Sequence, residues 1–471
     1  MSNPYVIIGG DAAGMSAASK LKRELPDAEV IVFERSHHIS FSACGIPYWI
    51  AGTVESDRRL MILTPERARE RRGIDVRTGH EVVAIDPEAK TVIVKRLANG
   101  ERLIQPYETL VIATGASAVR PPIPGLDLPG VFTLRSLEDG QQIFAYMASH
   151  TPKQAVIIGG GYIGVEMAEA LHDRQVAVTI VEMLPQLLPN FDSDMVEPVA
   201  EHIREKGVAT LTSRRVEAIT ATTEGADAGH SLSVLLDLDS GEALAADLVI
   251  VSTGVRPNSD LASTAGLKRG KSGAFWVDAQ MRTTDPHIYA AGDCVEHYHI
   301  VLGENAWIPL ATSANKGGRI AGDNIAAAVK GTPPSTFPGI AGTAVVKVFD
   351  YTMSVTGITE QQARRLGKWQ TDEDDGVGTA TVSAWEKAGY WPGAEKIQVK
   401  LVYAKATGRI LGGQIAGKAG VNKRIDIIAT AISAGMTVET LGMLDLSYAP
   451  PYSPTYDPVQ VCANVAARGS E

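Results

Sequence analysis

The chain has 471 residues, of which 45% are hydrophobic and 21% are charged. A chain of this length is expected to form about three domains, and its composition is typical of a globular protein with a large core, which excludes a disordered chain. The formal net charge of -10 argues against nucleic acid and anionic membranes as partners, because both are themselves negatively charged.

Its three cysteines stand far apart, at positions 44, 294 and 462, without the spacing of a zinc site or a disulfide framework. We therefore expect no metal site and a reducing, cytoplasmic environment. The first residues, MSNPYVIIGG, have no cationic segment before their short apolar run, which predicts a strand and no signal peptide. No apolar stretch approaches the roughly 18 residues that a membrane-spanning helix needs, so no membrane association is expected.

A repeat with a period of 150 residues dominates the first half of the chain. The apolar run and glycine turn of residues 6–10, VIIGG, recur at residues 156–160, and Gly14 has its counterpart in Gly164. In each copy a stretch with helical spacing follows, and then a second apolar strand that ends in glutamate. The pattern predicts two βαβ units.

Each unit has the features of a dinucleotide site. The glycines keep the turn tight and let the backbone approach a pyrophosphate, which the N-terminal end of the next helix attracts. The closing acids, Glu34 and Glu182, can accept hydrogen bonds from ribose hydroxyls. The second copy has all three glycines of the fingerprint, whereas the first has Asp11 at the middle position. A structural turn without a ligand is the alternative for the first copy.

Three later strand ends fit the same two sites. Residues 107–116 form an apolar strand that ends in Thr-Gly, and residues 283–293 form one that ends in Gly-Asp. The carboxylate of Asp293 can bind hydroxyls of a flavin's ribityl chain, with an ordinary exit from a strand as the alternative. Residues 248–259 repeat the Thr-Gly ending and are expected to close the second unit.

A linker rich in Pro and Gly follows at residues 330–339. Beyond it, alternating apolar residues predict antiparallel strands, and one stretch has helical spacing, so an α+β domain without a nucleotide motif is expected. The predicted class is α/β, with two Rossmann-like dinucleotide-binding domains and a C-terminal α+β domain. The expected boundaries are 1–148 and 256–331 for the first domain, 149–255 for the second and 332–471 for the third.

Together these features resemble the FAD/NAD(P)-dependent disulfide reductases. The two dinucleotide units, the segments ATG at 113–115 and TTDPHIYAAGD at 283–293, and the C-terminal domain carry this resemblance over essentially the whole chain. It implies FAD in the first unit, NADH or NADPH in the second, and a homodimer formed through the C-terminal domain. The positions that it places against the cofactors are Gly9, Gly10, Ala13, Gly14, Glu34, Arg35, Val82, Thr114, Gly115, Gly159, Gly161, Ile163, Gly164, Glu166, Glu182, Gly254, Gly292, Asp293, Ala311 and Thr312.

Cys44 places the chain within this family. Members similar to glutathione reductase carry a second cysteine five residues later and a C-terminal His–Glu pair, whereas this chain has Trp49 there and tyrosines without histidine near its end. It resembles the single-cysteine branch of coenzyme A disulfide reductases, NADH peroxidases and water-forming NADH oxidases. Peroxidases and oxidases of this branch have a histidine in the first glycine turn, and Ala12 at that position argues against peroxide chemistry.

Two motifs, SFSACGIPY around Cys44 and YAPPYS near the C-terminus, resemble the coenzyme A disulfide reductases most closely. In those enzymes two tyrosines of the partner subunit reach the cysteine, and their counterparts here are Tyr390 and Tyr448. The resemblance also places the coenzyme A phosphates against hydroxyl and basic residues, for which solvated helix faces are the alternative. These residues are Ser16, Lys20, Arg23, Ser40 and Arg72.

The resemblance implies a cycle in which electrons from the nicotinamide reach, through the flavin, a mixed disulfide on Cys44, and the Cys44 thiolate then attacks the next disulfide. We expect the flavin and helix N-termini to lower the pKa of Cys44, and Tyr390 or Tyr448 to protonate the leaving thiolate. Glu182 would repel a 2′-phosphate and therefore favours NADH, with NADPH as the alternative.

Three other functions stay open. Coenzyme A persulfide or polysulfide would use the same cysteine and the same pocket as coenzyme A disulfide. An NADH oxidase or peroxidase would carry a sulfenic acid on Cys44. A flavoprotein electron carrier would pass electrons to a protein partner, although a carrier needs neither the lone cysteine nor the terminal tyrosines.

Overall fold

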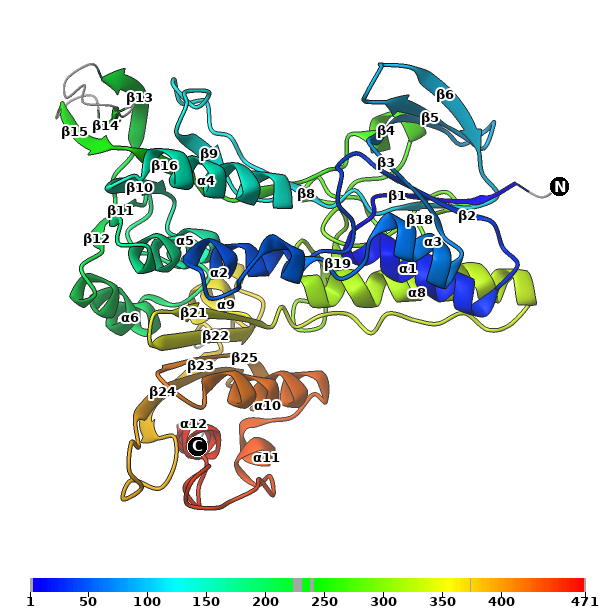
Figure 1. Cartoon of the computed structure of the whole chain (residues 1–471). Helices are drawn as coiled ribbons and strands as arrows, with labels where there is room; N and C mark the ends of the chain where they lie inside the picture. Colours follow the sequence, from blue (N-terminus) through cyan, green and yellow to red (C-terminus); the bar gives the residue numbers. More distant parts are fainter. Residues whose placement is uncertain (1–2, 223–230, 238–240, 373, 470–471) are drawn as a thin grey trace.

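Three five-stranded sheets, each with its own helices, organise the computed structural model, which describes residues 3–222, 231–237, 241–372 and 374–469. Figure 1 shows the first and second sheets at opposite ends of an elongated body, with the C-terminal sheet beneath the second. The two ends of this body correspond to the two copies of the sequence repeat.

The first sheet is parallel and carries the first glycine turn. Its strands, in spatial order, are β18 (Ile288–Ala290), β7 (Leu110–Ile112), β1 (Tyr5–Ile8), β2 (Val30–Glu34) and β3 (Asp75–Thr78). One face is covered by helices α1 (Ala12–Glu24) and α8 (Ala311–Lys330), and the other by an antiparallel sheet of β4 (His80–Asp86), β5 (Thr91–Arg96) and β6 (Arg102–Pro106) (Figure 1). Helix α3 (Pro65–Arg72) precedes β3.

Burial on both faces explains why these strands are apolar along their whole length. Helix α8 packs closely on α1 because two of its glycines, one turn apart, leave room for the α1 backbone. A Cβ on Gly318 would lie 2.2 Å from the carbonyl oxygen of Ala13, and one on Gly322 would lie 2.4 Å from that of Ala17. The two glycines therefore hold α8 against the helix that follows the first glycine turn.

The second sheet repeats this arrangement around the second glycine turn. Its parallel strands, in spatial order, are β12 (Ala209–Leu211), β11 (Ala177–Val181), β10 (Gln154–Ile158), β16 (Leu248–Val251) and β9 (Val131–Thr133). Its further elements are helices α4 (Leu137–His150), α5 (Tyr162–Asp173) and α6 (Ser193–Glu205), and the antiparallel strands β13 (Val216–Thr222), β14 (Ser231–Leu236) and β15 (Glu242–Ala246). The two-stranded pair β8 (Ala116–Ala118) and β17 (Val255–Pro257) lies between the first and second sheets (Figure 1).

The C-terminal sheet is antiparallel throughout. Its strands, in spatial order, are β21 (Ala344–Val348), β22 (Tyr351–Gly357), β25 (Ile410–Gly417), β24 (Lys396–Ala404) and β23 (Val377–Trp385). It packs on helices α10 (Val421–Ser433) and α12 (Pro458–Arg468), and also contacts α5 and α6 of the second unit. Helices α9 (Glu360–Leu366) and α11 (Val438–Gly442) complete this part of the chain.

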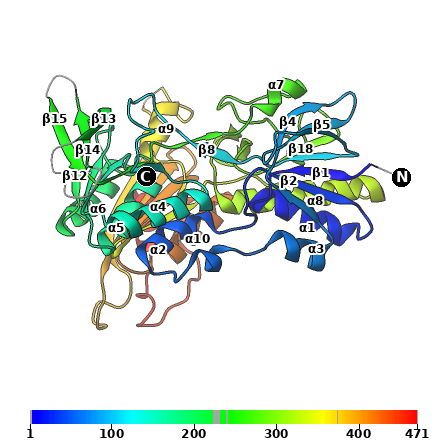
Figure 2. The same ribbon diagram turned by 45° about the horizontal axis from the view of Figure 1, so that its top comes forward.

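The remaining short elements include the segment that contains Cys44. The 3-10 helix η1 (Ala43–Gly45) continues into α2 (Ile46–Ala51), which packs against α4 and α5 of the second unit, as both views show (Figures 1 and 2). The others are η2 (Asp57–Leu60), α7 (Leu261–Ala265), β19 (His297–His299) and β20 (Glu304–Ala306).

The predicted fold class, with two Rossmann-like units and a C-terminal α+β domain, is confirmed. The exact domain boundaries stay predictions. Among the helices within the described ranges, none combines the length and the apolar character that a membrane span requires.

Two buried histidines of β19 predict how stability depends on pH. Burial lowers the pKa of His297 and of His299 from 6.5 to about 4, and neither ring nitrogen of His297 has a hydrogen-bond partner among the described residues. As the pH falls from 6.5 to 4, histidines of the unfolded chain bind protons, whereas the buried histidines of the folded protein stay neutral. The free energy of unfolding therefore keeps its full value above the unfolded pKa of 6.5 and decreases toward pH 4, by about 3 kcal/mol per histidine.

The variant His297→Leu is expected to reduce this loss. The difference in melting temperature between pH 7 and pH 5 should shrink in the variant, measured on the flavin-loaded protein. The exposed His287 provides the control, and His287→Leu should keep the wild-type difference. An unchanged difference in His297→Leu would show that His297 titrates normally in the folded protein.

Candidate active site

The first glycine turn leaves no space for side chains. Gly9 has a φ of +107°, and a Cβ there would lie 2.1 Å from the carbonyl oxygen of Ala113. A Cβ on Gly14 would lie 1.9 Å from the carbonyl oxygen of Gly9. The backbone N–H of Gly10 donates to the carboxylate of Glu34 at 2.7 Å, which fixes the turn against the end of β2. In this geometry a phosphate can come close to the backbone of the turn, and a carboxylate lies beside it.

The second turn repeats these contacts. Gly159 has a φ of +104°, and a Cβ on Gly164 would lie 2.0 Å from the carbonyl oxygen of Gly159. The N–H of Gly160 donates to Glu182 at 2.7 Å, as that of Gly10 does to Glu34. The fingerprint glycine of this copy, Gly161, faces open space, where no atom lies within 4 Å of a Cβ position. A pyrophosphate could approach the backbone there.

The residues around the first turn fit a flavin dinucleotide. The nearby side chains are small, since Ala13, Ala291 and Ala314 pack together there. Asp293 at the end of β18 is bound by Arg135 at 2.7 Å, and burial raises the pKa of Asp293. The first residues of α8, Ala311 and Thr312, are exposed, and the N-terminal end of a helix attracts phosphate. The small side chains leave room for a dinucleotide, the positive end of α8 suits its phosphates, and the carboxylate suits its hydroxyl groups.

The other predicted cofactor positions are distributed over both sheet edges. Thr114 and Gly115 follow β7 and are cross-linked to Asn258, whose side chain donates to the carbonyl of Thr114 at 2.8 Å. Val82 is buried in the core and pairs with Val94 of β5. The set also includes exposed residues (Arg35, Gly254, Ala311, Thr312) and half-buried ones (Ile163, Glu166). Their contacts with cofactors stay predictions.

Cys44 lies in η1, exposed at the surface between the first and second units. The residue five positions later, Trp49, is buried and stacks on the ring of Phe144 with centroids 4.9 Å apart. Cys294 is buried under the carbonyl oxygens of Ile112 and Ala291, and Cys462 is buried in the C-terminal core. All three thiols are free, and Cys44 is the accessible one.

The protein's own groups raise the pKa of Cys44 above its ordinary value. Partial burial of the sulfur is the main cause, the charge of Glu166 adds to it, and Arg135 acts in the opposite direction. Asp293 and Asp11 act in the same direction as Glu166. The lowering of this pKa that we expect from the flavin together with helix N-termini stays a prediction. Lowering the pKa requires a bound group.

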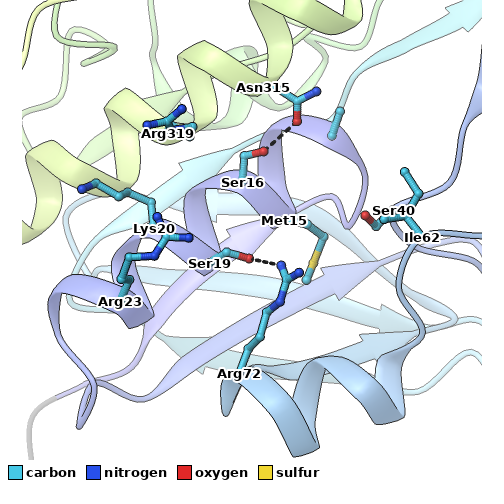
Figure 3. A pocket seen from close by; sticks show the side chains of 11 residues that line it. Met15, Ser16, Ser19, Lys20, Arg23, Ser40, Ile62, Arg72, Asn315 and Arg319 are labelled. Atoms are coloured by element: carbon cyan, nitrogen blue, oxygen red, sulfur yellow. Dashed lines mark hydrogen bonds between the residues drawn. The ribbon is translucent and has the colours of Figure 1, made fainter.

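A cavity of about 410 Å³ is bordered by α1, α3 and α8, and Figure 3 shows the side chains that line it. Every residue that the sequence assigned to coenzyme A lines it, although they come from three separate segments. The lining residues are Ala12, Met15, Ser16, Ser19, Lys20, Arg23, Ser40, Ile62, Arg72, Asn315 and Arg319. The five predicted positions are thus adjacent in space, and their contact with coenzyme A stays a prediction.

The basic side chains of the cavity differ in how far they are already neutralised. Lys20 pairs with Glu24 at 2.6 Å and with Asp323 at 2.9 Å, so its charge is balanced within the protein. Arg72 donates to the hydroxyl of Ser19 at 2.6 Å. Within the described part of the chain, Arg23, Arg72 and Arg319 form no salt bridge. These three arginines are the cations available to a ligand.

Sequence reasoning missed the two α8 residues, Asn315 and Arg319. Asn315 accepts a hydrogen bond from Ser16 at 2.8 Å and thereby links α8 to α1 (Figure 3). The two residues are four positions apart and so share a helix face. The spacing of Gly318 and Gly322, which indicates close helix packing, is the signal that could have placed this face beside α1.

The two predicted tyrosines lie on neighbouring loops of the C-terminal part, both exposed to solvent. The loop of Tyr390 and the loop of Tyr448 are joined by a hydrogen bond from Ala388 N–H to the carbonyl of Pro450 at 3.1 Å. Figure 1 shows both loops at the lower end of the molecule, away from α2. Within one chain, the two loops therefore lie away from α2, the helix that follows Cys44.

A buried arginine holds these two loops together. Arg424 of α10 pairs with Asp457 at 2.8 Å, and it also donates to the carbonyl oxygens of Glu386 at 2.6 Å and Tyr452 at 3.5 Å. Both members of the ion pair are buried. One side chain thus connects the loop that carries Tyr390 to the loop that carries Tyr448.

Arg424→Met is expected to destabilise the protein by about 3 kcal/mol, because it leaves Asp457 as an unpaired buried charge. Urea unfolding of the flavin-loaded protein measures the change. The neighbouring Lys423 has an exposed pair with Asp426 at 3.3 Å, so Lys423→Met should cost less than about 1 kcal/mol. Equal stability of the two variants would contradict the role assigned to Arg424.

Two profiles of known families match the chain. One is described as pyridine nucleotide-disulphide oxidoreductase and covers residues 3–318, and the other is the dimerisation domain of the same family and covers residues 343–458. The chain belongs to the pyridine nucleotide-disulphide oxidoreductase family. It is therefore a pyridine nucleotide-dependent oxidoreductase, and this membership implies FAD and NAD(P)H as cofactors.

Named relatives and solved structures resemble the whole chain. A protein of Pyrococcus horikoshii named NAD(P)H coenzyme A polysulfide/persulfide reductase is 38% identical over 99% of this chain and 98% of its own length. The structure of an NAD-dependent persulfide reductase from A. fulgidus is 40% identical, with a TM-score of 0.91, over 99% of this chain and 83% of that one. A water-forming NADH oxidase from Lactobacillus brevis, bound to NADH, is 29% identical with a TM-score of 0.91, over 100% and 99%.

Proposed function

We propose that the chain is an FAD-dependent NAD(P)H reductase of coenzyme A disulfides and persulfides that works through a mixed disulfide on Cys44. One observation carries this proposal: the five residues that the family resemblance placed against coenzyme A line a single cavity (Figure 3). Ser40, at the edge of that cavity, is only four residues from Cys44. A thiol whose phosphates lie among the arginines can extend its sulfur toward Cys44.

The reaction needs one group that accepts electrons and one that exchanges sulfur. Bound FAD supplies two-electron transfer between the nicotinamide and the sulfur. Cys44 attacks a disulfide as the thiolate, releases one thiol and keeps the other as a mixed disulfide. Reduction of that mixed disulfide releases the second thiol and restores the thiolate. The sum is NAD(P)H + H⁺ + RS–SR → NAD(P)⁺ + 2 RSH, in which two electrons break one S–S bond.

A second copy of the chain is proposed to complete the site. Tyr390 and Tyr448 are exposed on loops directed away from α2, and both loops belong to or border the region that matches the family's dimerisation domain. A homodimer formed through that domain would bring the tyrosines of one protomer to the Cys44 of its partner. The hydroxyl of a tyrosine can donate its proton to a leaving thiolate.

NADH is proposed as the preferred nucleotide. The carboxylate of Glu182 accepts from Gly160 at 2.7 Å and from Leu184 at 2.8 Å, so it is held at the end of β11 where the ribose would lie. A carboxylate accepts a hydrogen bond from a 2′-hydroxyl and repels a 2′-phosphate. The exposed residues that follow, Met183 and Leu184, offer no cation for that phosphate.

Water formation from O₂ is the second candidate, because a structurally similar relative is named a water-forming NADH oxidase. Ala12 lines the cavity at the position where the oxidases of the family have histidine, so the site lacks that donor. Persulfide reduction is favoured because the chain is 38% and 40% identical to proteins named persulfide reductases but 29% identical to the NADH oxidase.

The test is NADH consumption without oxygen, with coenzyme A disulfide, coenzyme A persulfide or hydrogen peroxide as acceptor, and O₂ in a separate assay. We expect coenzyme A disulfide or persulfide to be the best acceptor and Cys44→Ser to lose this turnover while its flavin is still reduced by NADH. Cys294→Ala, which removes a buried thiol, is the matched control and should keep turnover. Full disulfide turnover by Cys44→Ser would refute the proposal, and a preference for O₂ or peroxide would favour the oxidase.

A further inference from the structure

The segment that carries Cys44 belongs to the first unit in sequence but packs in the core of the second. Residues 40–62, here called the cysteine segment, lie between strands β2 and β3 of the first sheet in the chain. The residues that flank it, Ile39 and Leu63, are part of the core of the first unit. Four of its apolar side chains instead pack with residues of α4 and α5 in the core of the second unit, and these are Ile46, Trp49, Ile50 and Leu60. The second unit therefore holds a segment that is inserted into the first.

The two ends of the cysteine segment are joined to each other and to the first glycine turn. The N–H of Ile62 donates to the carbonyl oxygen of Ser40 at 2.9 Å, and the N–H of Ser40 donates to the carbonyl oxygen of Gly10 at 3.0 Å. Helix α2, at the far end of the segment, packs on α4 and α5 (Figures 1 and 2). Cys44 thus lies in the chain between an anchor on the first unit and an anchor on the second.

A glycine of α4 makes room for α2. A Cβ on Gly140 would lie 2.5 Å from the Cγ2 atom of Ile46 and 3.4 Å from the ring of Trp49. Ile46 is β-branched, so its Cγ2 atom has one preferred orientation on a helix and cannot swing aside freely. Glycine is less favourable than alanine in the interior of a helix. Gly140 is thus unfavourable for α4 itself, and its effect is to permit the close contact with α2.

Trp49 anchors α2 on the second unit. Its side chain is buried, and its ring stacks on that of Phe144 of α4 with an angle of 15° between the two planes. The guanidinium of Arg174, at the end of α5, lies 5.9 Å from the centroid of the Phe144 ring. The same guanidinium donates to the carbonyl oxygen of Ile50 at 2.7 Å. These side chains join α2, α4 and the end of α5.

We propose that the second unit positions the Cys44 thiol in addition to binding the nicotinamide nucleotide, and that Gly140 and Trp49 are the positioning residues. The inference rests on the proposed function, in which the sulfur of Cys44 attacks a disulfide. That sulfur must also receive electrons through the flavin, so its position relative to two groups has to be fixed. An error of about 1 Å in the position of a reacting atom can lower a rate about 100-fold.

Gly140→Ala tests the contact without weakening the helix that carries the substitution. The added methyl group must displace Ile46 and with it α2, whereas alanine favours α4 itself. In the flavin-loaded enzyme, kcat should fall about 10-fold or more with coenzyme A disulfide and also with bis(2-hydroxyethyl) disulfide, because thiol position matters for any disulfide. The flavin content, the KM for NADH and the rate at which NADH reduces the flavin should keep their wild-type values.

Amide hydrogen exchange reports the position of α2 independently of activity. Gly140→Ala should raise the exchange of residues 43–51 and leave that of α1 unchanged. Trp49→Leu, which removes the stacked ring, should lower kcat in the same way, whereas Trp49→Phe should retain most of it. The matched control is Gln142→Ala at an exposed position of α4, which should change neither kcat nor exchange.

Other outcomes overturn the inference in distinguishable ways. Wild-type kcat in both Gly140→Ala and Trp49→Leu would reject the positioning role, and the proposed function would stand if Cys44→Ser has lost turnover. A loss confined to flavin reduction by NADH would show that the contact serves the nucleotide site alone. An equal loss of every rate, with faster exchange in all parts of the chain, would indicate general destabilisation and no positioning role. Retained turnover in Cys44→Ser would remove the proposed function and this inference with it.

Discussion

Gly14→Ala is expected to yield a protein that is purified without its flavin. A Cβ at this position would lie 1.9 Å from the carbonyl oxygen of Gly9 and 3.3 Å from the side chain of Ile7. Both contacts are with groups of β1 and its turn, which cannot move without displacing the sheet, so overpacking here should cost about 3 kcal/mol or more. The turn that approaches the pyrophosphate would open. The ratio of flavin absorbance at 450 nm to protein absorbance measures the loss.

Gly161→Ala in the second turn is the matched control. Gly161 has a φ of -75°, which alanine adopts freely, and its Cβ would meet no atom within 4 Å. We expect this variant to fold and to retain FAD. If the pyrophosphate of the nicotinamide cofactor approaches this open backbone, the added methyl group should raise KM for NADH at least several-fold. Normal flavin content in Gly14→Ala would contradict the interpretation of the first turn.

Removing the available arginines of the cavity should weaken binding of coenzyme A disulfide. Arg23 and Arg319 line the cavity and form no salt bridge within the described residues, so a phosphate would gain a charge-assisted hydrogen bond from each. Arg23→Gln and Arg319→Gln should each raise KM for coenzyme A disulfide about 10- to 100-fold, because such a bond contributes roughly 1.5–3 kcal/mol. Lys20→Gln should have a smaller effect, since Glu24 and Asp323 already balance that charge.

A disulfide without phosphates separates binding from chemistry. With bis(2-hydroxyethyl) disulfide, which is neutral, as acceptor, the same variants should show wild-type KM and kcat values, because the arginines would then have no anion to bind. Arg365→Gln, which removes one exposed charge on α9, should leave KM unchanged for both disulfides. A rise in KM for both disulfides would indicate general damage to the site and would reject the assignment of the cavity to the phosphates.

The chain order of residues was sufficient to predict the two βαβ units and their glycine turns. Both turns depend on contacts within a short stretch: Gly14 meets the carbonyl of Gly9, and Gly10 meets Glu34 across one βαβ unit. Such contacts are local, so the same spacing produces the same geometry twice, 150 residues apart. The predicted helix after each turn and the apolar strands on either side were confirmed for the same reason.

The cavity could be predicted only in part. Ser16, Lys20 and Arg23 lie on one helix, and their common face follows from helical spacing. That Lys20 is neutralised by Asp323 could not be read from the sequence, since the two residues are 303 positions apart and meet only because α8 packs on α1. Arg319 joins the cavity through the same packing. The resemblance to a family supplied Ser40 and Arg72, which no local pattern would have brought together with α1.

The sequence by itself determined that Cys44 is a lone thiol near a dinucleotide turn, because residue identity and short-range spacing are sufficient for that statement. Only the tertiary structure decided what surrounds the thiol. The packing of α2 on α5 brings Glu166 to Tyr48 across 118 positions, and the loop before α4 brings Arg135 to Asp293 across 158. Charge and burial act through space, so the pKa of Cys44 is raised by groups that no spacing in the sequence connects to it.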